Sequence, residues 1–229
     1  MPRQINNSNL ITFYVPKSPI SEAYRTLRTN IQFSSIDKKI RVLMVASAQS
    51  GEGKSTTVSN LAVTYAQEGK KVLLIDADLR KPTIHRIFGL SNRTGLTSVI
   101  TGQFHSSEAI QSTEVENLSI LPSGAVPPNP AELLASQKMK AFINEMKDTY
   151  DIIIFDTPPV LAVADSLIVS SVCDGVVIVI QEGKVKRELV KRAKESLERV
   201  NAKLIGVVLN NVKKSKKNGY YYYYHETAE

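Results

Sequence analysis

VASAQSGEGKSTTVSNLA, at residues 45–62, contains the most informative turn of the chain. Its first residues are apolar, as in a buried strand, and its last residues carry a helical pattern. Between them, Gly51 and Gly53 let the backbone curl so that its N–H groups point inward. Such a turn, followed directly by the positive end of a helix, binds phosphate oxygens. The stretch therefore predicts a strand, a phosphate-binding loop (P-loop) and a helix in succession.

Lys54 and Ser55 give this loop its chemistry. A lysine at this point reaches the β and γ phosphates of a nucleotide, and the hydroxyl that follows can ligate magnesium. The sequence departs from the consensus G-x-x-x-x-G-K-[ST] only at the start, where Ala48 stands in place of glycine. The nucleotide-binding residues predicted from the motif are Ser50, Gly51, Glu52, Gly53, Lys54, Ser55 and Thr56.

Three aspartates follow two other apolar segments. VLLIDADLR carries Asp76 and Asp78, two residues apart and so on one side of an extended chain, and IIIFDTPP carries Asp156. Carboxylates at the carboxyl ends of parallel strands lie where ligands bind in open α/β sheets. Solvation of strand ends would explain one such aspartate, but poorly explains three. We predict that Ser55, Asp78 and Asp156 hold Mg²⁺, directly or through water.

Strand-like and helix-like segments alternate along the chain. The predicted strands are RVLMVAS, KVLLID, LSILPSG, YDIIIFDT, GVVIVIQ and KLIGVVLN, and several are apolar on both faces. The predicted helices are residues 54–67, 129–147, with Asn129 as cap and Pro130 first, and 186–200. This order predicts an α/β, doubly wound, mostly parallel sheet with helices on both faces, as in P-loop NTPases. One domain is expected from 229 residues, with loosely ordered ends at 1–17 and 213–229.

Residues 18–33 are predicted to form a helix before the first strand, with Ser18 as cap and Pro19 in its first turn. The apolar stripe expected to face the core comprises Ile20, Ala23, Tyr24, Leu27 and Ile31. A charged outer ridge is expected from Glu22, Arg25 and Arg28. Taken alone, the ridge is most simply a solvated surface.

Bulk properties narrow the class of protein. No apolar stretch approaches the ~20 residues of a membrane helix, and the N-terminus lacks the apolar core of a secretory signal. A single cysteine, Cys173, excludes an internal disulfide and fits a reducing compartment, so the predicted location is cytoplasmic. The net charge is +7, with +9 concentrated between Lys184 and Lys217. This basic block is either solvated surface or a surface for polyanions or anionic membranes.

NGYYYYYHETAE closes the chain, with five adjacent tyrosines, Tyr220, Tyr221, Tyr222, Tyr223 and Tyr224. Taken alone, such a run could equally be an aromatic tail that adheres to partners. Because a tyrosine hydroxyl has a pKa near ~10, it attacks phosphorus only with help from a carboxylate that accepts its proton. Either Asp76 or Asp78 could be that base, and we favour Asp76.

ASAQSGEGKST, LLIDADLRKP and IIIFDTPP resemble the Walker A, second Walker-type and Walker B motifs of bacterial tyrosine kinases. The resemblance extends from about residue 18 to the C-terminus, and it is most specific for the cytoplasmic kinases of capsule and exopolysaccharide clusters. It implies a kinase domain at 18–212 that uses ATP and Mg²⁺, an N-terminal extension at 1–17, and a tail at 213–229. Glu22, Arg25 and Arg28 then resemble the motif that joins subunits into a ring, and Tyr220 to Tyr224 the autophosphorylated cluster.

The resemblance also implies partners. They are the cytoplasmic tail of a transmembrane activator (a polysaccharide co-polymerase) that recruits the kinase to the inner face of the membrane, a cognate tyrosine phosphatase, and protein substrates. No nucleic acid is expected. Asn210, at the end of the last predicted strand, is implied to contact adenine.

Two other functions compete with the kinase. A partition- or division-type ATPase would bind DNA or membrane through the basic block, but those proteins carry a second lysine early in the loop, where this chain has Gln49. A non-catalytic adaptor would use the tyrosine tail for adhesion alone.

Overall fold

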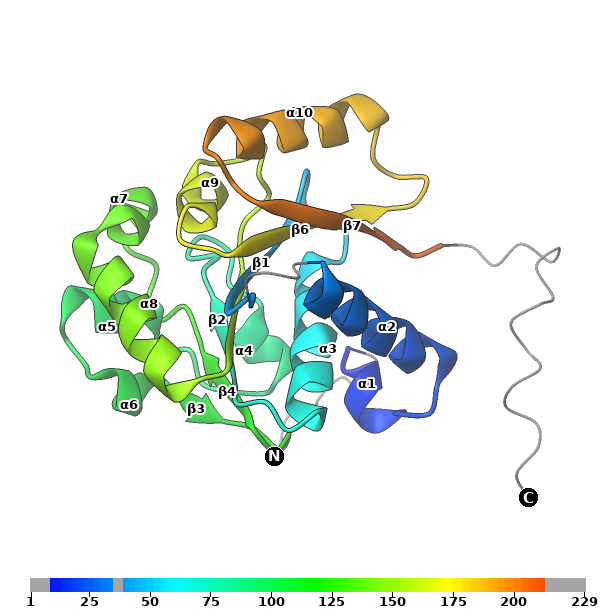
Figure 1. Cartoon of the computed structure of the whole chain (residues 1–229). Helices are drawn as coiled ribbons and strands as arrows, with labels where there is room; N and C mark the ends of the chain where they lie inside the picture. Colours follow the sequence, from blue (N-terminus) through cyan, green and yellow to red (C-terminus); the bar gives the residue numbers. More distant parts are fainter. Residues whose placement is uncertain (1–8, 35–38, 213–229) are drawn as a thin grey trace, which may run out of the picture.

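A computed structural model describes residues 9–34 and 39–212, which form one sheet covered by helices on both faces (Figure 1). Within this part of the chain the sheet has seven strands in the order β3-β4-β2-β5-β1-β6-β7, and all neighbours are parallel except β3 and β4. The strands are β1 Val42–Ser47, β2 Val72–Asp76, β3 Gln111–Ser112, β4 Leu118–Leu121, β5 Ile152–Asp156, β6 Gly175–Gln181 and β7 Leu204–Asn210. The predicted fold class is confirmed.

The first four helices of the described chain cover one face of the sheet, and the later six cover the other. The first face carries α1 Ile11–Tyr14, α2 Pro19–Phe33, α3 Lys54–Gln67 and α4 Ile84–Ile87. The second carries α5 Leu96–Thr101, α6 Ser106–Ala109, α7 Pro130–Ala135, α8 Gln137–Thr149, α9 Asp165–Ser170 and α10 Arg187–Arg199. No helix in residues 9–34 and 39–212 combines the length and the apolarity needed to cross a bilayer.

Three central strands hold the two layers together. All residues of β1, β2 and β5 are buried, and along β1 they alternate between the cores. Val42 and Met44 pack into the core under α8 to α10, while Leu43 and Val45 pack under α3. A strand that is apolar on both faces is required wherever helices cover both sides of a sheet. All six predicted strands are present.

The helix predicted at residues 129–147 is wrong as a single element. Ser136 has an extended backbone, with φ −66° and ψ 155°, which ends α7 and precedes α8. Its hydroxyl accepts the Met139 N–H at 3.2 Å and so caps α8, whereas the Asn129 side chain does not cap α7. Serine competes with the helical backbone in this way, and the pattern of apolar residues does not reveal it.

The N-terminal segment is ordered from residue 9 onward, so the expectation of loose order at residues 1–17 is wrong for residues 9–17. Thr12 in α1 is fully buried against α3. Its hydroxyl donates to Asn60 Oδ1 at 2.8 Å and its N–H to the same oxygen at 3.0 Å, while Asn60 Nδ2 donates to the Asn9 carbonyl at 2.7 Å. A polar network satisfied on both sides anchors this short helix.

The cap of α2 is confirmed, because Ser18 Oγ accepts the Ser21 N–H at 3.1 Å. The predicted apolar stripe is only partly right, since Ile20 is 54% exposed. Arg28 does not stand on the outer ridge: it donates to the Thr64 carbonyl at 2.7 Å and only 16% of its side chain is exposed. The helix therefore rests on α3 partly through an arginine, and its accessible charged pair is Glu22 with Arg25.

Replacing Thr12 with Val should lower the free energy of unfolding by about 1–2 kcal/mol, because a buried hydroxyl partner of Asn60 is lost without a change in side-chain shape. Urea unfolding measures this. Thr26→Val, at an exposed position of α2, should stay near the wild type. Equal stabilities of the two variants would show that α1 does not anchor through this hydrogen bond.

Candidate nucleotide-binding site

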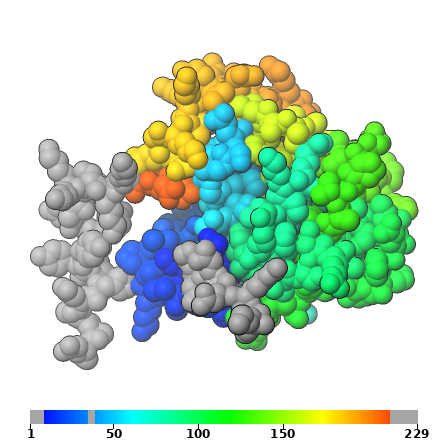
Figure 2. Space-filling model, turned by 180° about the vertical axis from the view of Figure 1, so that it is seen from behind, coloured from blue at the N-terminus to red at the C-terminus, as the bar shows by residue number. Residues whose placement is uncertain are grey.

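A cavity of about 560 Å³ opens at the carboxyl ends of β1, β2 and β5. The P-loop contributes Ser50, Gly51, Gly53, Lys54, Ser55 and Thr56, and the segment after β2 contributes Asp78, Arg80, Lys81, Thr83 and Arg86. Figure 2 shows this side of the molecule, where the cyan segment around the P-loop lies between the yellow β6–α10 segment and the teal segment after β2. The topology thus brings most of the predicted site residues to one edge of the sheet.

The glycines of the loop are required by its shape. Gly51 and Gly53 have φ of 78° and 85°, the left-handed region that side chains disfavour. A Cβ at Gly53 would also lie 2.1 Å from Asn210 Nδ2. Because α3 begins at Lys54, the loop delivers its backbone N–H groups directly at the positive end of a helix.

Asp156 is the centre of the polar contacts beneath the loop. It is fully buried, it pairs with the Lys54 ammonium, and its Oδ2 accepts the Ser55 hydroxyl at 2.7 Å. This hydroxyl and carboxylate are hard oxygen ligands of the kind that Mg²⁺ takes beside phosphate oxygens and water. In the described part of the chain no three His, Cys, Asp or Glu side chains form a group that could hold a metal ion.

Asp76 lies opposite Asp156 on the adjacent strand and has no exposed surface. Its Oδ2 accepts the N–H groups of Thr83 and Ile84 at 2.9 and 3.0 Å. Burial and, next, the Asp156 charge raise the pKa of Asp76 from 3.8 to about 7, against the opposing effect of those hydrogen bonds and of Lys54. Asp76 does not line the cavity, and its assignment as the base stays a prediction.

Asp78 is the carboxylate of the pair that reaches the cavity. Its Oδ1 accepts the Lys81 N–H at 2.9 Å, which fixes the turn after β2. Arg80 also lines the cavity, and its guanidinium donates in a fork to Asp165 at 2.8 and 3.1 Å. Asp165 is fully buried in the first turn of α9, and the sequence reasoning missed it, because an acidic residue there is also ordinary for a helix start.

The ends of β6 and β7 hold the outer side of the P-loop. The Glu52 side chain is buried rather than directed into the cavity, and it accepts the N–H groups of Gln49 and Gln181. Asn210 Nδ2 donates to the Glu52 carbonyl at 2.9 Å, and Lys184 Nζ, also missed from sequence, donates to the Gly51 carbonyl at 3.0 Å. Contact of Glu52 with nucleotide and of Asn210 with adenine stay predictions.

The remaining site predictions fall in two places. Glu22 and Arg25 pair with each other on α2, where a second subunit could reach them, and no partner chain tests this role. The tyrosines Tyr220, Tyr221, Tyr222, Tyr223 and Tyr224 lie outside the described residues.

Comparisons with known proteins identify the family. The model of a family described as an AAA domain matches residues 40–208. The chain is 52% identical over 207 residues to the tyrosine-protein kinase YwqD of Bacillus subtilis strain 168, covering 90% of this chain and 87% of that protein. The chain belongs to the bacterial tyrosine kinases.

The solved structures agree with this family. The chimerical protein CapA2B2 superposes with a TM-score of 0.88 at 43% identity, covering 90% of this chain and 91% of that one. The septum site-determining protein MinD from Pyrococcus horikoshii OT3, complexed with Mg-ADP, gives a TM-score of 0.66 at 26% identity, covering 77% and 72%. The kinase branch is thus closer in both sequence and structure than the division-site branch, and protein-tyrosine kinase is the enzyme class of this chain.

The pKa of Asp76 has a consequence for stability. Between about pH 4 and about pH 7 the unfolded chain has released this proton while the folded chain keeps it, so stability falls as the pH rises through that window. We expect the wild type to lose stability relative to Asp76→Asn between about pH 4 and about pH 7. Urea unfolding without nucleotide, in the presence of a magnesium chelator, measures the difference.

The control for this experiment is Asp148→Asn, at an exposed position of α8, whose stability should follow that of the wild type across the same pH range. If the curves of wild type and Asp76→Asn run parallel, Asp76 does not hold its proton in the folded protein.

Proposed function

We propose that this kinase transfers the γ-phosphoryl group of ATP to the tyrosines Tyr220 to Tyr224 of its own chain. The observation that supports this most directly is the contact of both Lys54 and Ser55 with the buried Asp156, beneath a cavity that Lys54, Ser55 and Asp78 line. Phosphate-binding, metal-binding and proton-accepting groups are thereby within one site. The tyrosine cluster supplies a phenol on the same chain.

The transfer requires three groups of the chain. Asp78 accepts the proton of the tyrosine hydroxyl. The tyrosine oxygen bonds to the γ-phosphorus, and the bond from that phosphorus to the bridging β–γ oxygen breaks, which releases ADP. Lys54 leaves Asp156 to meet the β and γ phosphates and stabilises their charge. Ser55 and Asp156 would hold Mg²⁺, which supplies further positive charge at the phosphates.

Asp76 has a positioning role in this site. Its carboxylate fixes the N–H groups of Asp78, Thr83 and Ile84, and so it holds the turn that carries Asp78 and Arg80. Arg80, oriented by Asp165, then faces the nucleotide or a neighbouring subunit.

Assembly into a ring gives the tail access to a neighbouring site. We propose that Glu22 and Arg25 on α2 contact the next subunit and that the tail of one subunit is phosphorylated by the other. Each phosphate adds roughly −1.5 to −2 charge beside a basic segment. The accumulating charge releases the tail and loosens the ring.

The cellular role follows from the resemblance to capsule and exopolysaccharide kinases. We propose that the chain regulates the synthesis or export of such a polysaccharide. The proposed partners are the cytoplasmic tail of a transmembrane activator, which brings the kinase to the inner face of the membrane, a tyrosine phosphatase, and other protein substrates.

Lys54→Met and Asp78→Asn should each reduce phosphorylation of Tyr220 to Tyr224 by about 100-fold or more, since one removes phosphate stabilisation and the other the proton acceptor. Incubation with ATP, Mg²⁺ and the activator tail, followed by mass spectrometry of the C-terminal peptide, measures it. Lys138→Met, on an exposed position of α8, is the control.

An unphosphorylated tail in the wild-type chain under these conditions would contradict the kinase assignment. Hydrolysis that DNA stimulates, without phosphate on the protein, would instead support a partition-type ATPase.

Arg25 and Arg28 should separate assembly from stability. Arg25→Ala should shift the protein to smaller oligomers. Little stability should be lost, because the partners of Arg25 within the chain are the exposed Glu22 carboxylate and the Pro16 carbonyl. Arg28→Ala should lower the free energy of unfolding by about 1–3 kcal/mol, because it removes a largely buried charged donor to the Thr64 carbonyl.

Light scattering after size exclusion and urea unfolding measure these two quantities. If Arg25→Ala leaves the oligomeric size unchanged, the proposed subunit contact on α2 is incorrect.

A further inference from the structure

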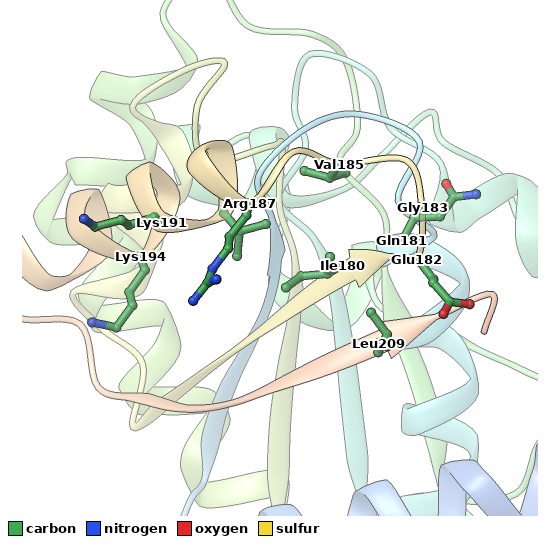
Figure 3. A pocket seen from close by; sticks show the side chains of 10 residues that line it. Ile180, Gln181, Glu182, Gly183, Val185, Arg187, Lys191, Lys194 and Leu209 are labelled. Atoms are coloured by element: carbon green, nitrogen blue, oxygen red, sulfur yellow. The ribbon is translucent and has the colours of Figure 1, made fainter. Parts of the chain in front are cut away.

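A second cavity, of about 450 Å³, lies between α10 and the carboxyl ends of β6 and β7 (Figure 3). We call it the α10 groove. Ile180, Val185, Val190 and Leu209 form its apolar floor, and Arg187, Lys191 and Lys194 form a basic rim on the α10 side. Gln181, Glu182 and Gly183 line the other end, so the cavity also contains one carboxylate. Figure 3 shows Arg187 and the two lysines projecting from α10, and Ile180 and Leu209 from the adjacent strands. An apolar floor beside three cations suits a ligand with a ring and an anionic group.

The α10 groove is separate from the nucleotide cavity. The two cavities share no lining residue. Successive residues of a strand point to opposite faces, and accordingly Leu209 lines the α10 groove while Asn210 contacts the P-loop. Leu209 is 53% exposed, and Val207, two residues earlier on this edge strand, is 59% exposed. Apolar surface at the mouth of the groove is therefore uncovered in the described part of the chain.

We propose that the α10 groove binds the chain's own C-terminal segment, residues 213–229, once its tyrosines carry phosphate. This rests on the proposed autophosphorylation. A phenyl ring would pack on Ile180, Val185 and Leu209, and its phosphate would accept hydrogen bonds from Arg187, Lys191 and Lys194. A phosphotyrosine carries both the ring and the phosphate on a single side chain.

Within the rim, Arg187 is the residue whose charge favours an anionic occupant. Lys191 and Lys194 each have a glutamate one turn along α10, with nitrogen–oxygen distances of 3.9 Å to Glu195 and 2.7 Å to Glu198. Arg187 makes no ion pair with another described residue. Its planar guanidinium is the better partner for phosphate, since it can donate two parallel hydrogen bonds.

The length of the chain beyond the structure places the tyrosines within reach. The described chain ends at Val212, three residues after the groove-lining Leu209. Residues 213–219 can extend about 23 Å, while Arg187 and Lys194 are separated by about 10 Å along their helix. Because the segment is tethered beside the groove, its effective concentration there is on the order of millimolar, so weak contacts suffice.

Phosphate is needed because the unmodified segment has the wrong charge. It carries Lys213, Lys214, Lys216 and Lys217, which the basic rim repels. Five phosphates would add a charge of roughly −7.5 to −10, which reverses the sign of the segment's net charge. The groove therefore discriminates between the substrate and product forms of the same segment.

An anionic membrane is the other occupant that a basic rim could attract. The apolar surface here lies inside a groove, at Ile180 and Leu209 between helix and strand, and not along an outer face of α10. A lipid surface would contact the exposed ridge and leave that floor uncovered. A single ring fits it better.

The test uses the full chain with each of Tyr220 to Tyr224 replaced by Phe, which cannot be phosphorylated. A labelled synthetic peptide of residues 213–229 is titrated and its binding followed by fluorescence anisotropy. We expect the peptide with five phosphotyrosines to bind at least about tenfold more tightly than the unmodified peptide. A peptide with five phosphoserines, which keeps the charge but removes the rings, should also bind at least about threefold more weakly than the phosphotyrosine peptide.

Substitutions then locate the site. Arg187→Glu should weaken binding of the phosphotyrosine peptide by about tenfold, and Leu209→Ser by about threefold. Arg192→Glu is the matched control, because Arg192 is exposed on the same helix and does not line the groove. It should change the affinity by less than about twofold.

Two outcomes would overturn the proposal. Equal loss for Arg187→Glu and Arg192→Glu, or equal affinity of the phosphotyrosine and phosphoserine peptides, would show attraction by charge alone. Competition by phosphatidylserine vesicles, with a loss of vesicle binding in Arg192→Glu, would identify a membrane surface instead. Because the peptide is made synthetically, none of these outcomes depends on whether the chain phosphorylates itself.

Discussion

The contact of Lys54 with Asp156 is the interaction on which the site depends. It is largely buried, and a buried ion pair is a poor source of stability because both ions lose their hydration. Its value is positional. The strand order β2-β5-β1 brings Asp76 next to Asp156 and places both beside the P-loop, so two carboxylates share a single ammonium. Burial, and next the negative charge of Asp156, raises the pKa of Asp76 to about 7, and the single ammonium of Lys54 opposes this only in part. A nucleotide arriving with its metal would alter this balance, since Lys54 would turn to phosphate while the metal replaced it at Asp156.

Elements whose own residues carry a clear pattern could be predicted from the sequence. The six longer strands, α3 and α10 carry clear apolar periodicity or a glycine-shaped turn, and all of them are present. The elements missed or misplaced depend on contacts from elsewhere. α1 is held by Asn60 of α3, the two-residue β3 exists only by pairing with β4, and Arg28 is drawn inward by a carbonyl of α3. None of these partners is visible from the segment itself.

The same division applies to the site. The loop and the residues predicted to hold magnesium belong to short motifs, so the positions of Lys54, Ser55 and Asp156 beside one another could be predicted from sequence. Asp76 and Asp78 could not be told apart, because alternation along a strand holds only while the strand continues, and β2 ends at Asp76. Asp165 and Lys184 act through loops that meet only in the folded molecule, where one orients Arg80 and the other holds the Gly51 carbonyl.

The β6–α10 loop connects the two cavities physically. Gly183 and Val185 line the α10 groove, and Lys184 between them bonds to the P-loop, so a ligand in the groove would restrain a segment that supports the phosphate site. The nucleotide cavity lies at the carboxyl ends of β1, β2 and β5, and the groove lies at the carboxyl ends of β6 and β7 beside α10. Under the two proposals, the tail would enter a neighbouring subunit's nucleotide cavity as a neutral phenol and would bind its own α10 groove only as an anion. Phosphoryl transfer would then decide which of the two cavities the same segment occupies.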